Sequence, residues 1–167
     1  MQCRECAYDE GGAWFRLRAA AVIMHDSQVL MMSNPATSYF YSVGGAIEHG
    51  ESAEDAVRRE VREELGLDLE VDRLLFVHEN VFTDATTDVL RGKLCHEVAL
   101  YFLMRYAGES FEVNSCDAYG QPEDAVWLPV AEFASYPAYP RFFATELAEL
   151  PASPKHIVTR DVTHDLS

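Results

Sequence analysis

The pattern of apolar and polar residues predicts a largely β-structured chain with one well-marked helix. Residues 14–24 (WFRLRAAAVIM) begin with alternating side chains and become apolar on both faces, as in a strand entering the middle of a sheet. Residues 28–32 are apolar again after a polar turn, which predicts a hairpin. A short aromatic strand, residues 39–41, then leads into Gly44 and Gly45.

The second half of the chain carries further strand and helix patterns but no linker. Residues 67–80 and 94–106 are rich in β-formers and are joined by a polar loop, which predicts a long hairpin. A short strand is expected at 125–128, helices at 130–134 and 141–150, and the tail from residue 151 has weak signals. Without repeats or linkers, we expect one α/β domain over 1–167, with its core at about 14–150.

The helix expected at residues 52–65 has clear ends. Ser52 is a favourable N-cap with Asp55 three residues later, and Gly66 suits a left-handed residue after the last turn. On a helical wheel, its apolar residues form one stripe spanning about 120°, which should face the core. This stripe consists of Ala53, Val57, Val61 and Leu65.

Three glutamates lie where solvated charge is not expected. Glu64 falls inside the apolar stripe at about 20°, and Glu60 and Glu63 follow its edge. Burial and mutual repulsion both oppose ionisation of carboxylates at this spacing. A plain salt-bridged helix is the alternative, with its arginines as partners, but most of those arginines lie on the opposite side. A divalent cation would compensate, and Mg²⁺ prefers such oxygen ligands.

The charge of the chain limits what it can bind. A net charge of −15 repels a polyanionic backbone, so we expect no nucleic-acid partner. The chain lacks the apolar run of about 20 residues that a membrane span needs, and its first residues are polar, so we expect no membrane partner and a cytoplasmic protein. Small phosphorylated substrates remain, provided that metal balances their charge locally.

At this point the residues resemble a known family. From Gly45 the chain reads GAIEHGESAEDAVRREVREELGL, which fills every specified position of the Nudix box. The resemblance implies an α/β/α Nudix sandwich, a mixed sheet flanked by helices with a loop-helix-loop. It also implies hydrolysis of a nucleoside diphosphate linked to another group. The matching positions are Gly45, Glu51, Arg59, Glu60, Val61, Glu63, Glu64, Gly66 and Leu67.

The resemblance also assigns roles to single residues. Glu60, Glu63 and Glu64 look like metal ligands, with the Gly45 carbonyl as a backbone ligand and Mg²⁺, or Mn²⁺ in its place, as the cofactor. Glu51 and Arg59 are similar to the family's supporting ion pair. The general base stays open among the three glutamates and acids outside the box, with Glu63 or Glu60 first.

Two acids and three aromatic residues outside the box are further candidates. Glu97, expected at a strand start, and Glu123, before a short strand, could add ligands or be merely exposed. Tyr41, Phe82 and Tyr101 could stack on a base, although aromatic residues in strands more often belong to the core. A nucleoside di- or triphosphate is the leading substrate class, followed by a nucleotide sugar or a dinucleotide.

Other hypotheses remain open. A non-catalytic nucleotide-sensing module usually loses box carboxylates, which this chain retains. A prenyl-diphosphate isomerase of the same fold would make Cys95 the residue to test. Cys3 and Cys6 form a Cys-x-x-Cys pair without the second ligand pair that a zinc site needs. Family members often dimerise, so a homodimer is also considered.

Overall fold

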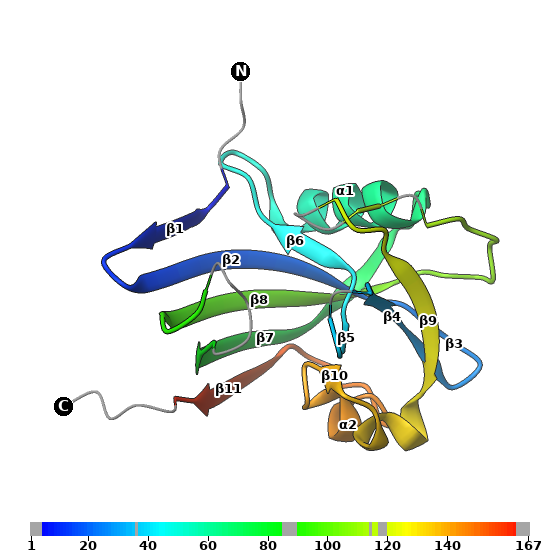
Figure 1. The fold of residues 1–167 in the computed structure, drawn as a ribbon. Coiled ribbons are helices and arrows are strands. Elements are labelled where there is room, and N and C mark those ends of the chain that lie inside the picture. Colours follow the sequence, from blue (N-terminus) through cyan, green and yellow to red (C-terminus); the bar gives the residue numbers. More distant parts are fainter. Residues whose placement is uncertain (1–4, 36, 85–89, 114, 117–119, 163–167) are drawn as a thin grey trace.

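The computed structural model describes residues 5–35, 37–84, 90–113, 115–116 and 120–162. Its first sheet is mixed, with strand order β1-β2-β8-β7-β11 and β6 paired to β2 (Figure 1). In this sheet β2 runs parallel to β8 and β7 runs parallel to β11, whereas the other pairs are antiparallel. Its strands are β1 (Ala7–Glu10), β2 (Ala13–Val22), β6 (Gly44–Ala46), β7 (Val71–Thr83), β8 (Leu94–Met104) and β11 (Lys155–Asp161).

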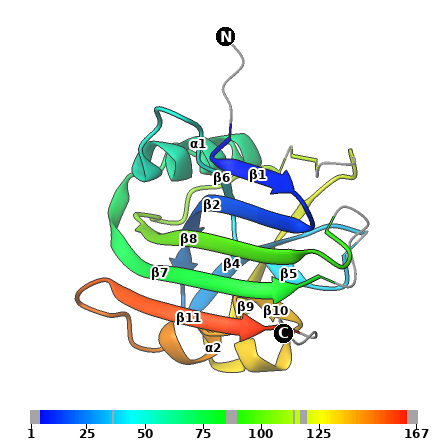
Figure 2. The same ribbon diagram turned by 90° about the vertical axis from the view of Figure 1, so that its left-hand side faces the viewer.

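The second sheet is shorter and lies behind the first when the first is viewed face-on (Figure 2). Its order is β10-β5-β4-β3, with β9 also paired to β4. Its strands are β3 (Met24–His25), β4 (Gln28–Ser33), β5 (Phe40–Tyr41), β9 (Asp124–Pro129) and β10 (Ala138–Tyr139). The helices are α1 (Ala53–Leu65), a 3₁₀ helix (Val130–Ser135) and α2 (Phe143–Glu146).

The first predicted hairpin is only partly correct. Its tip exists, because β3 and β4 pair antiparallel across Asp26 and Ser27, whose φ angles of 47° and 61° suit a tight hairpin turn. The long strand β2, however, pairs with β8 in the first sheet and not with β4. The chain therefore changes sheets near Ile23, where a run that is apolar on both faces is buried from both sides.

The long hairpin is confirmed, and the end of the chain differs from expectation. Strands β7 and β8 pair antiparallel along most of their length. The expected helix at 141–150 is limited to the four residues of α2. Pro151 disfavours the helical conformation only at Leu150, so it does not account for the end of α2 at Glu146. Beyond it, β11 pairs parallel with β7 in a tail whose sequence signals were weak.

Two apolar clusters lie on opposite faces of β2. Ala19 and Ala21 belong to the cluster that packs against Val57, Val61 and Leu65 of α1. Ala20 and Val22 belong to the other cluster, which includes side chains of α2 and the 3₁₀ helix. Because side chains alternate across a strand, one strand supports both layers. The predicted α/β class with a mixed sheet is confirmed, although the helices are few.

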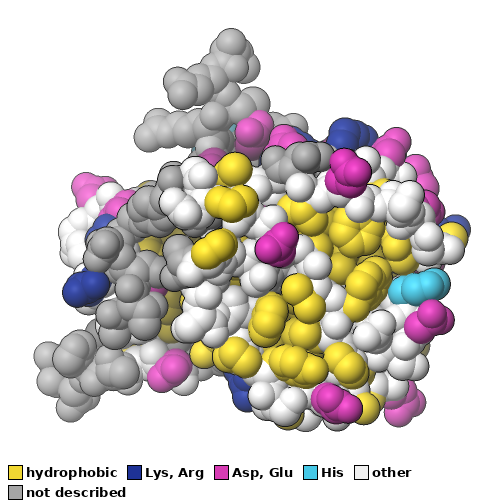
Figure 3. Space-filling view, turned by 45° about the vertical axis from the view of Figure 1, so that its right-hand side comes forward, with side chains coloured by type: hydrophobic (Ala, Val, Ile, Leu, Met, Phe, Trp, Pro, Cys, Tyr) yellow, Lys and Arg dark blue, Asp and Glu magenta, His cyan; other side chains and the backbone are white. Residues whose placement is uncertain are grey.

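One face of the molecule is rich in apolar side chains. Figure 3 shows apolar side chains gathered on the face that carries β3 and β9, interrupted by single acidic side chains. On these strands the rings of His25 and Trp127 lie 6.1 Å apart, and Tyr106 contacts both. Among the described residues, no helix is long and apolar enough to cross a membrane.

Candidate functional site

Helix α1 has the ends that the sequence predicted. The Ser52 hydroxyl accepts a hydrogen bond from the Asp55 backbone N–H at 3.1 Å, and Gly66 ends the helix with a φ of 67°. Val57, Val61 and Leu65 are buried as expected. The apolar stripe therefore fixes the rotation of the helix, and with it the direction of the glutamates on its edge.

Strand β6 brings two glycines against these glutamates. A Cβ atom added to Gly45 would lie 2.5 Å from Oε1 of Glu60, and one added to Gly44 would lie 2.3 Å from the Ala19 carbonyl oxygen. Gly44 also has a φ of 140° and donates its N–H to Oε1 of Glu64 at 3.0 Å. Glycine at both positions therefore allows the backbone to lie directly beside the helix carboxylates.

Arg59 connects the loop to the helix. Its Nε and Nη2 donate to the two oxygens of Glu51, each at 2.9 Å, and Nη2 also donates to the Ala46 carbonyl at 3.1 Å. Its Nη1 donates to Glu60 at 2.5 Å and to Glu63 at 3.3 Å. The hydrogen bonds from Arg59 hold the pKa of Glu51 below its ordinary value, although burial opposes this. Every nitrogen of the Arg59 guanidinium thus donates a hydrogen bond to the box loop or to helix α1.

Glu64 and Glu60 are not fully neutralised by these contacts. Burial, with smaller contributions from the charges of Glu60 and Glu123, raises the pKa of Glu64 to about 8, although the Gly44 N–H acts in the opposite direction. Oε2 of Glu64 is buried without a hydrogen-bond partner among the described residues. Burial also raises the pKa of Glu60, in spite of Arg59. Glu60 is thus paired with Arg59 and Glu64 has no ion pair among the described residues, yet burial raises the pKa of both carboxylates.

Glu63 differs from the expected half-buried position. Its side chain is 59% exposed and accepts a hydrogen bond from Arg59 at 3.3 Å. Within the described part of the chain, no three His, Cys, Asp or Glu side chains already form a group that could hold a metal ion. The orphaned Glu64 oxygen, the neighbouring Glu60 carboxylate and the close approach of the Gly45 backbone to Glu60 nevertheless suit a small cation with oxygen ligands.

Glu123 reaches the same site from the other sheet. The Tyr41 hydroxyl donates to Oε1 of Glu123 at 2.5 Å, and Asn34 lies 3.4 Å from the same hydroxyl. Burial and the Glu123 hydrogen bond raise the pKa of Tyr41, and the charge of Glu64 contributes as well. Glu123 in turn contributes to the raised pKa of Glu64. Tyr41, expected as a stacking residue, therefore binds an acid through its hydroxyl.

Glu97 occupies a different environment from the one expected. Strand β8 begins at Leu94, so Glu97 lies inside the strand and is only 7% exposed. Oε2 of Glu97 accepts hydrogen bonds from Nε and Nη2 of Arg16 at 2.8 and 2.5 Å. Burial raises its pKa, but Arg16 and Arg18 outweigh burial and leave the pKa below its ordinary value. This carboxylate already has its cationic partner.

The other two aromatic candidates lie away from the box carboxylates. Tyr101 is 2% exposed and packs among Phe142 and Phe143, so no face of its ring is open to a base in this structure. Phe82 is partly buried and meets Trp14 edge-on at 6.4 Å. Trp14 itself lies four residues, or about 13 Å, along β2 from Arg18.

Sequence reasoning missed Arg16 and Arg18, which lie beside the site on β2. Both belong to the same face of the strand, because they are two residues apart. Arg18 donates through Nη2 to the Ser42 carbonyl at 2.7 Å and to the Gly44 carbonyl at 3.2 Å. Two arginines at this spacing in an otherwise apolar strand were the available signal.

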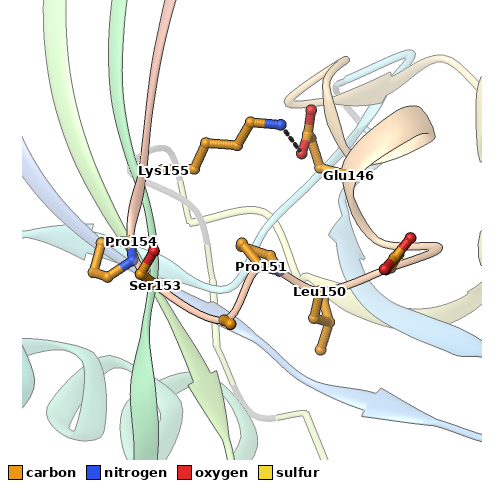
Figure 4. A pocket seen from close by; sticks show the side chains of 8 residues that line it. Glu146, Leu150, Pro151, Ser153, Pro154 and Lys155 are labelled. Carbon is orange, nitrogen blue, oxygen red and sulfur yellow. Dashed lines mark hydrogen bonds and ion pairs between the residues drawn. The ribbon is translucent and has the colours of Figure 1, made fainter.

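The cysteines and a surface hollow lie elsewhere. Cys6 has its sulfur 3.7 Å from Nδ1 of His49, and Cys3 lies outside the described residues. Cys95 is fully buried, and burial raises the pKa of its thiol. A hollow of about 420 Å³ is lined by Glu146 and residues 149–155, with Lys155 paired to Glu146 at 2.7 Å (Figure 4). None of the box glutamates lines this hollow.

Comparison with known proteins identifies a family match. The model of the NUDIX domain matches residues 15–146. The chain is 30% identical over 124 residues to Nudix hydrolase 2 of Arabidopsis thaliana, which covers 71% of this chain and 40% of that protein. It is 33% identical over 90 residues to the ADP-ribose pyrophosphatase of Methanocaldococcus jannaschii, covering 52% of this chain and 48% of that protein. The chain thus spans less than half the length of these two relatives.

Further matches cover more of the compared proteins. The CTP pyrophosphohydrolase of Escherichia coli is 27% identical over 133 residues, covering 77% of this chain and 92% of that protein. A crystal structure of a MutT Nudix hydrolase from Burkholderia pseudomallei superposes with a TM-score of 0.52 at 26% identity, covering 70% of this chain and 84% of that one. A MutT protein from Bacillus halodurans gives a TM-score of 0.59 at 18% identity, covering 84% and 89%, which shows the fold alone.

Proposed function

We propose, from the premise that this chain belongs to the Nudix family, that it hydrolyses the diphosphate linkage of a nucleoside diphosphate derivative with the help of a divalent cation. The observation that carries this proposal is the state of Glu64. It is a partly buried carboxylate with an unpartnered oxygen, beside Glu60 and the Gly44-Gly45 backbone. A cation with oxygen ligands would satisfy it.

The residues that would hold the cation follow from this arrangement. We assign Glu60, Glu63 and Glu64 as carboxylate ligands and the Gly45 carbonyl as the backbone ligand. Mg²⁺ is the expected ion and Mn²⁺ its substitute, because hard oxygen ligands suit both. When bound, the cation polarises the diphosphate and lowers the pKa of an attacking water.

The side chains of residues 45–67, the loop and helix of the box, hold the ligands in place and supply the general base. Arg59 holds Glu51, Glu60 and Glu63 through hydrogen bonds, so the loop and the helix keep one arrangement. Glu63 is the most exposed of the three glutamates assigned as ligands and is the one that water reaches most easily. We therefore rank Glu63 first as the general base, with Glu60 and Glu123 as the remaining candidates.

The substrate class is supported by the relatives. The Escherichia coli protein that this chain covers almost fully is named a CTP pyrophosphohydrolase, and the archaeal relative is named an ADP-ribose pyrophosphatase. A nucleoside triphosphate is accordingly the leading substrate, and a nucleotide sugar or dinucleotide comes next. The isomerase alternative loses support, because Cys95 is fully buried.

A substrate panel tests the proposal. The protein is incubated with nucleoside triphosphates, ADP-ribose, nucleotide sugars and dinucleotides, each with Mg²⁺, with Mn²⁺ or with a chelator, and products are identified by mass. We expect metal-dependent release of a nucleoside monophosphate from at least one class. Turnover that persists under chelation, or no product from any class with either metal, would overturn the proposal.

A further inference from the structure

Arg18 is a cation placed directly beside the box backbone. On β2 it lies opposite Ala46 of β6 on one side and Ala99 of β8 on the other. Its Nη2 donates to the carbonyls of Ser42 and Gly44, at 2.7 and 3.2 Å. Gly44 immediately precedes Gly45, so the guanidinium lies one residue from the proposed backbone ligand.

Arg18 differs from its neighbouring arginines in forming no ion pair with a carboxylate of the described residues. Arg59 forms ion pairs with three glutamates, and Arg16 pairs with Glu97. In the described part of the chain, the hydrogen bonds of Arg18 go to backbone carbonyls only, and its Nε is buried with no partner. A partly buried guanidinium that is satisfied on one nitrogen retains donors for an anion.

The surroundings of Arg18 keep it charged. Burial lowers its pKa, but the charges of Glu97, Glu64 and Glu60 outweigh burial and raise the pKa above its ordinary value. These carboxylates lie on both sides of Arg18, on β8 and on α1. A negatively charged substrate that approaches the box acids would therefore meet a charged guanidinium that, among the described residues, forms no direct ion pair.

We infer that Arg18 binds a non-bridging phosphate oxygen of the substrate's diphosphate. The planar guanidinium donates to phosphate oxygens with strong charge-assisted hydrogen bonds. Arg59 cannot fill this role, because each of its nitrogens already serves the loop-helix unit. The inference rests on the proposed function, since it takes a diphosphate as the ligand. The competing role is structural, in which Arg18 only braces the Ser42 and Gly44 carbonyls.

Binding measurements on two ligands separate these roles. The full-length wild type is compared with Arg18→Met and Arg18→Lys, and Arg62→Met serves as the control. Arg62 is 56% exposed and pairs with Asp68, so its variant loses the same charge from the outer side of α1. Mn²⁺ alone is titrated by electron paramagnetic resonance, and inorganic pyrophosphate is titrated by calorimetry into the Mn²⁺-loaded protein.

We expect Arg18→Met to bind Mn²⁺ within about twofold of the wild type and to lose about 10- to 100-fold in pyrophosphate affinity. Arg18→Lys should lose less, and Arg62→Met should match the wild type. Unchanged pyrophosphate affinity in Arg18→Met, or a parallel loss of Mn²⁺ affinity, would overturn the inference in favour of bracing. If Arg18→Met fails to fold, Arg18→Lys decides by the same two titrations.

The outcome also separates this inference from the proposed function. Arg18-dependent pyrophosphate binding in a protein that turns over no substrate would leave the inference standing and remove the hydrolase proposal. Metal-dependent hydrolysis with pyrophosphate binding that is independent of Arg18 would leave the hydrolase proposal standing and remove the inference about Arg18.

Discussion

Glu64 on α1 and Glu97 on β8 are two carboxylates with little solvent contact that flank the same arginine, yet their environments have opposite effects. Glu97 accepts two hydrogen bonds from Arg16, and its pKa is lowered in spite of burial. Glu64 accepts one backbone N–H, its other oxygen has no partner among the described residues, and burial raises its pKa to about 8. We infer from this difference that Glu97 has a structural role, because the protein supplies its cation, and that Glu64 is left for a cation from solution.

The largest effect is expected on activity, from variants of the α1 glutamates assigned as cation ligands. Glu63→Gln and Glu64→Gln should each lower turnover by about 10²- to 10⁴-fold while circular dichroism shows an intact fold. Glu54→Gln is the matched control, because Glu54 is an exposed glutamate in the first turn of the same helix. Wild-type turnover in both box variants, measured on the substrate found by the panel, would sink the catalytic assignment.

The second effect is expected on stability, from variants of the Arg16–Glu97 ion pair. Arg16→Met leaves Glu97 buried without its partner, which should lower the free energy of unfolding by about 2–4 kcal/mol. Glu97→Gln should cost less, because Arg16 is about one third exposed and regains water. Urea denaturation of the two variants measures this order. A smaller loss in Arg16→Met than in Glu97→Gln would contradict the account of the pair.

The two acids should also give opposite pH dependence in the metal-free protein. The raised pKa of Glu64 means that the folded state holds a proton that the unfolded state has lost between about pH 4.5 and 8, so its contribution to stability falls as pH rises through that window. The lowered pKa of Glu97 means that its contribution is present above about pH 4.5 and is lost on acidification below it.

Urea denaturation at a series of pH values, with chelator present, checks both directions. Relative to the wild type, Glu64→Gln should gain stability toward pH 8. The deficit of Glu97→Gln in free energy of unfolding should shrink toward pH 3. Parallel pH curves for the wild type and both variants would show that neither carboxylate is perturbed by folding.

The smallest effect is expected from a change that leaves both carboxylates in place. Ser52→Ala removes the acceptor for the Asp55 N–H, which should cost about 1 kcal/mol of stability. Pyrophosphatase turnover at a temperature well below unfolding should stay within about twofold of the wild type. A large loss of turnover would mean that the position of α1 depends on its cap more than on the core stripe.

Much of the Glu64 environment could be predicted from sequence because it is local. The caps at Ser52 and Gly66 and the stripe of Val57, Val61 and Leu65 fix the helix and its rotation, and all lie within fifteen residues. The environment of Glu97 could not be predicted, since it depends on the register between β2 and β8, which places Arg16 beside a residue 81 positions away.

The same reason explains the other differences. Strand β11 is an exposed edge strand with few buried residues, and its parallel pairing with β7 spans almost eighty positions. Tyr101 and Tyr41 are both tyrosines in strands, yet one is buried in the core and the other holds Glu123. Periodicity could not separate them, because the sheet that covers each residue comes from distant parts of the chain.

The central claim is that the box carboxylates, and not Glu97, need a divalent cation. Titration of Mn²⁺ by electron paramagnetic resonance into wild type, Glu64→Gln and Glu97→Gln tests it most directly. We expect tight Mn²⁺ binding in the wild type and in Glu97→Gln, and a loss of affinity of at least about tenfold in Glu64→Gln. Equal Mn²⁺ affinity in the wild type and Glu64→Gln, or a selective loss in Glu97→Gln, would contradict it.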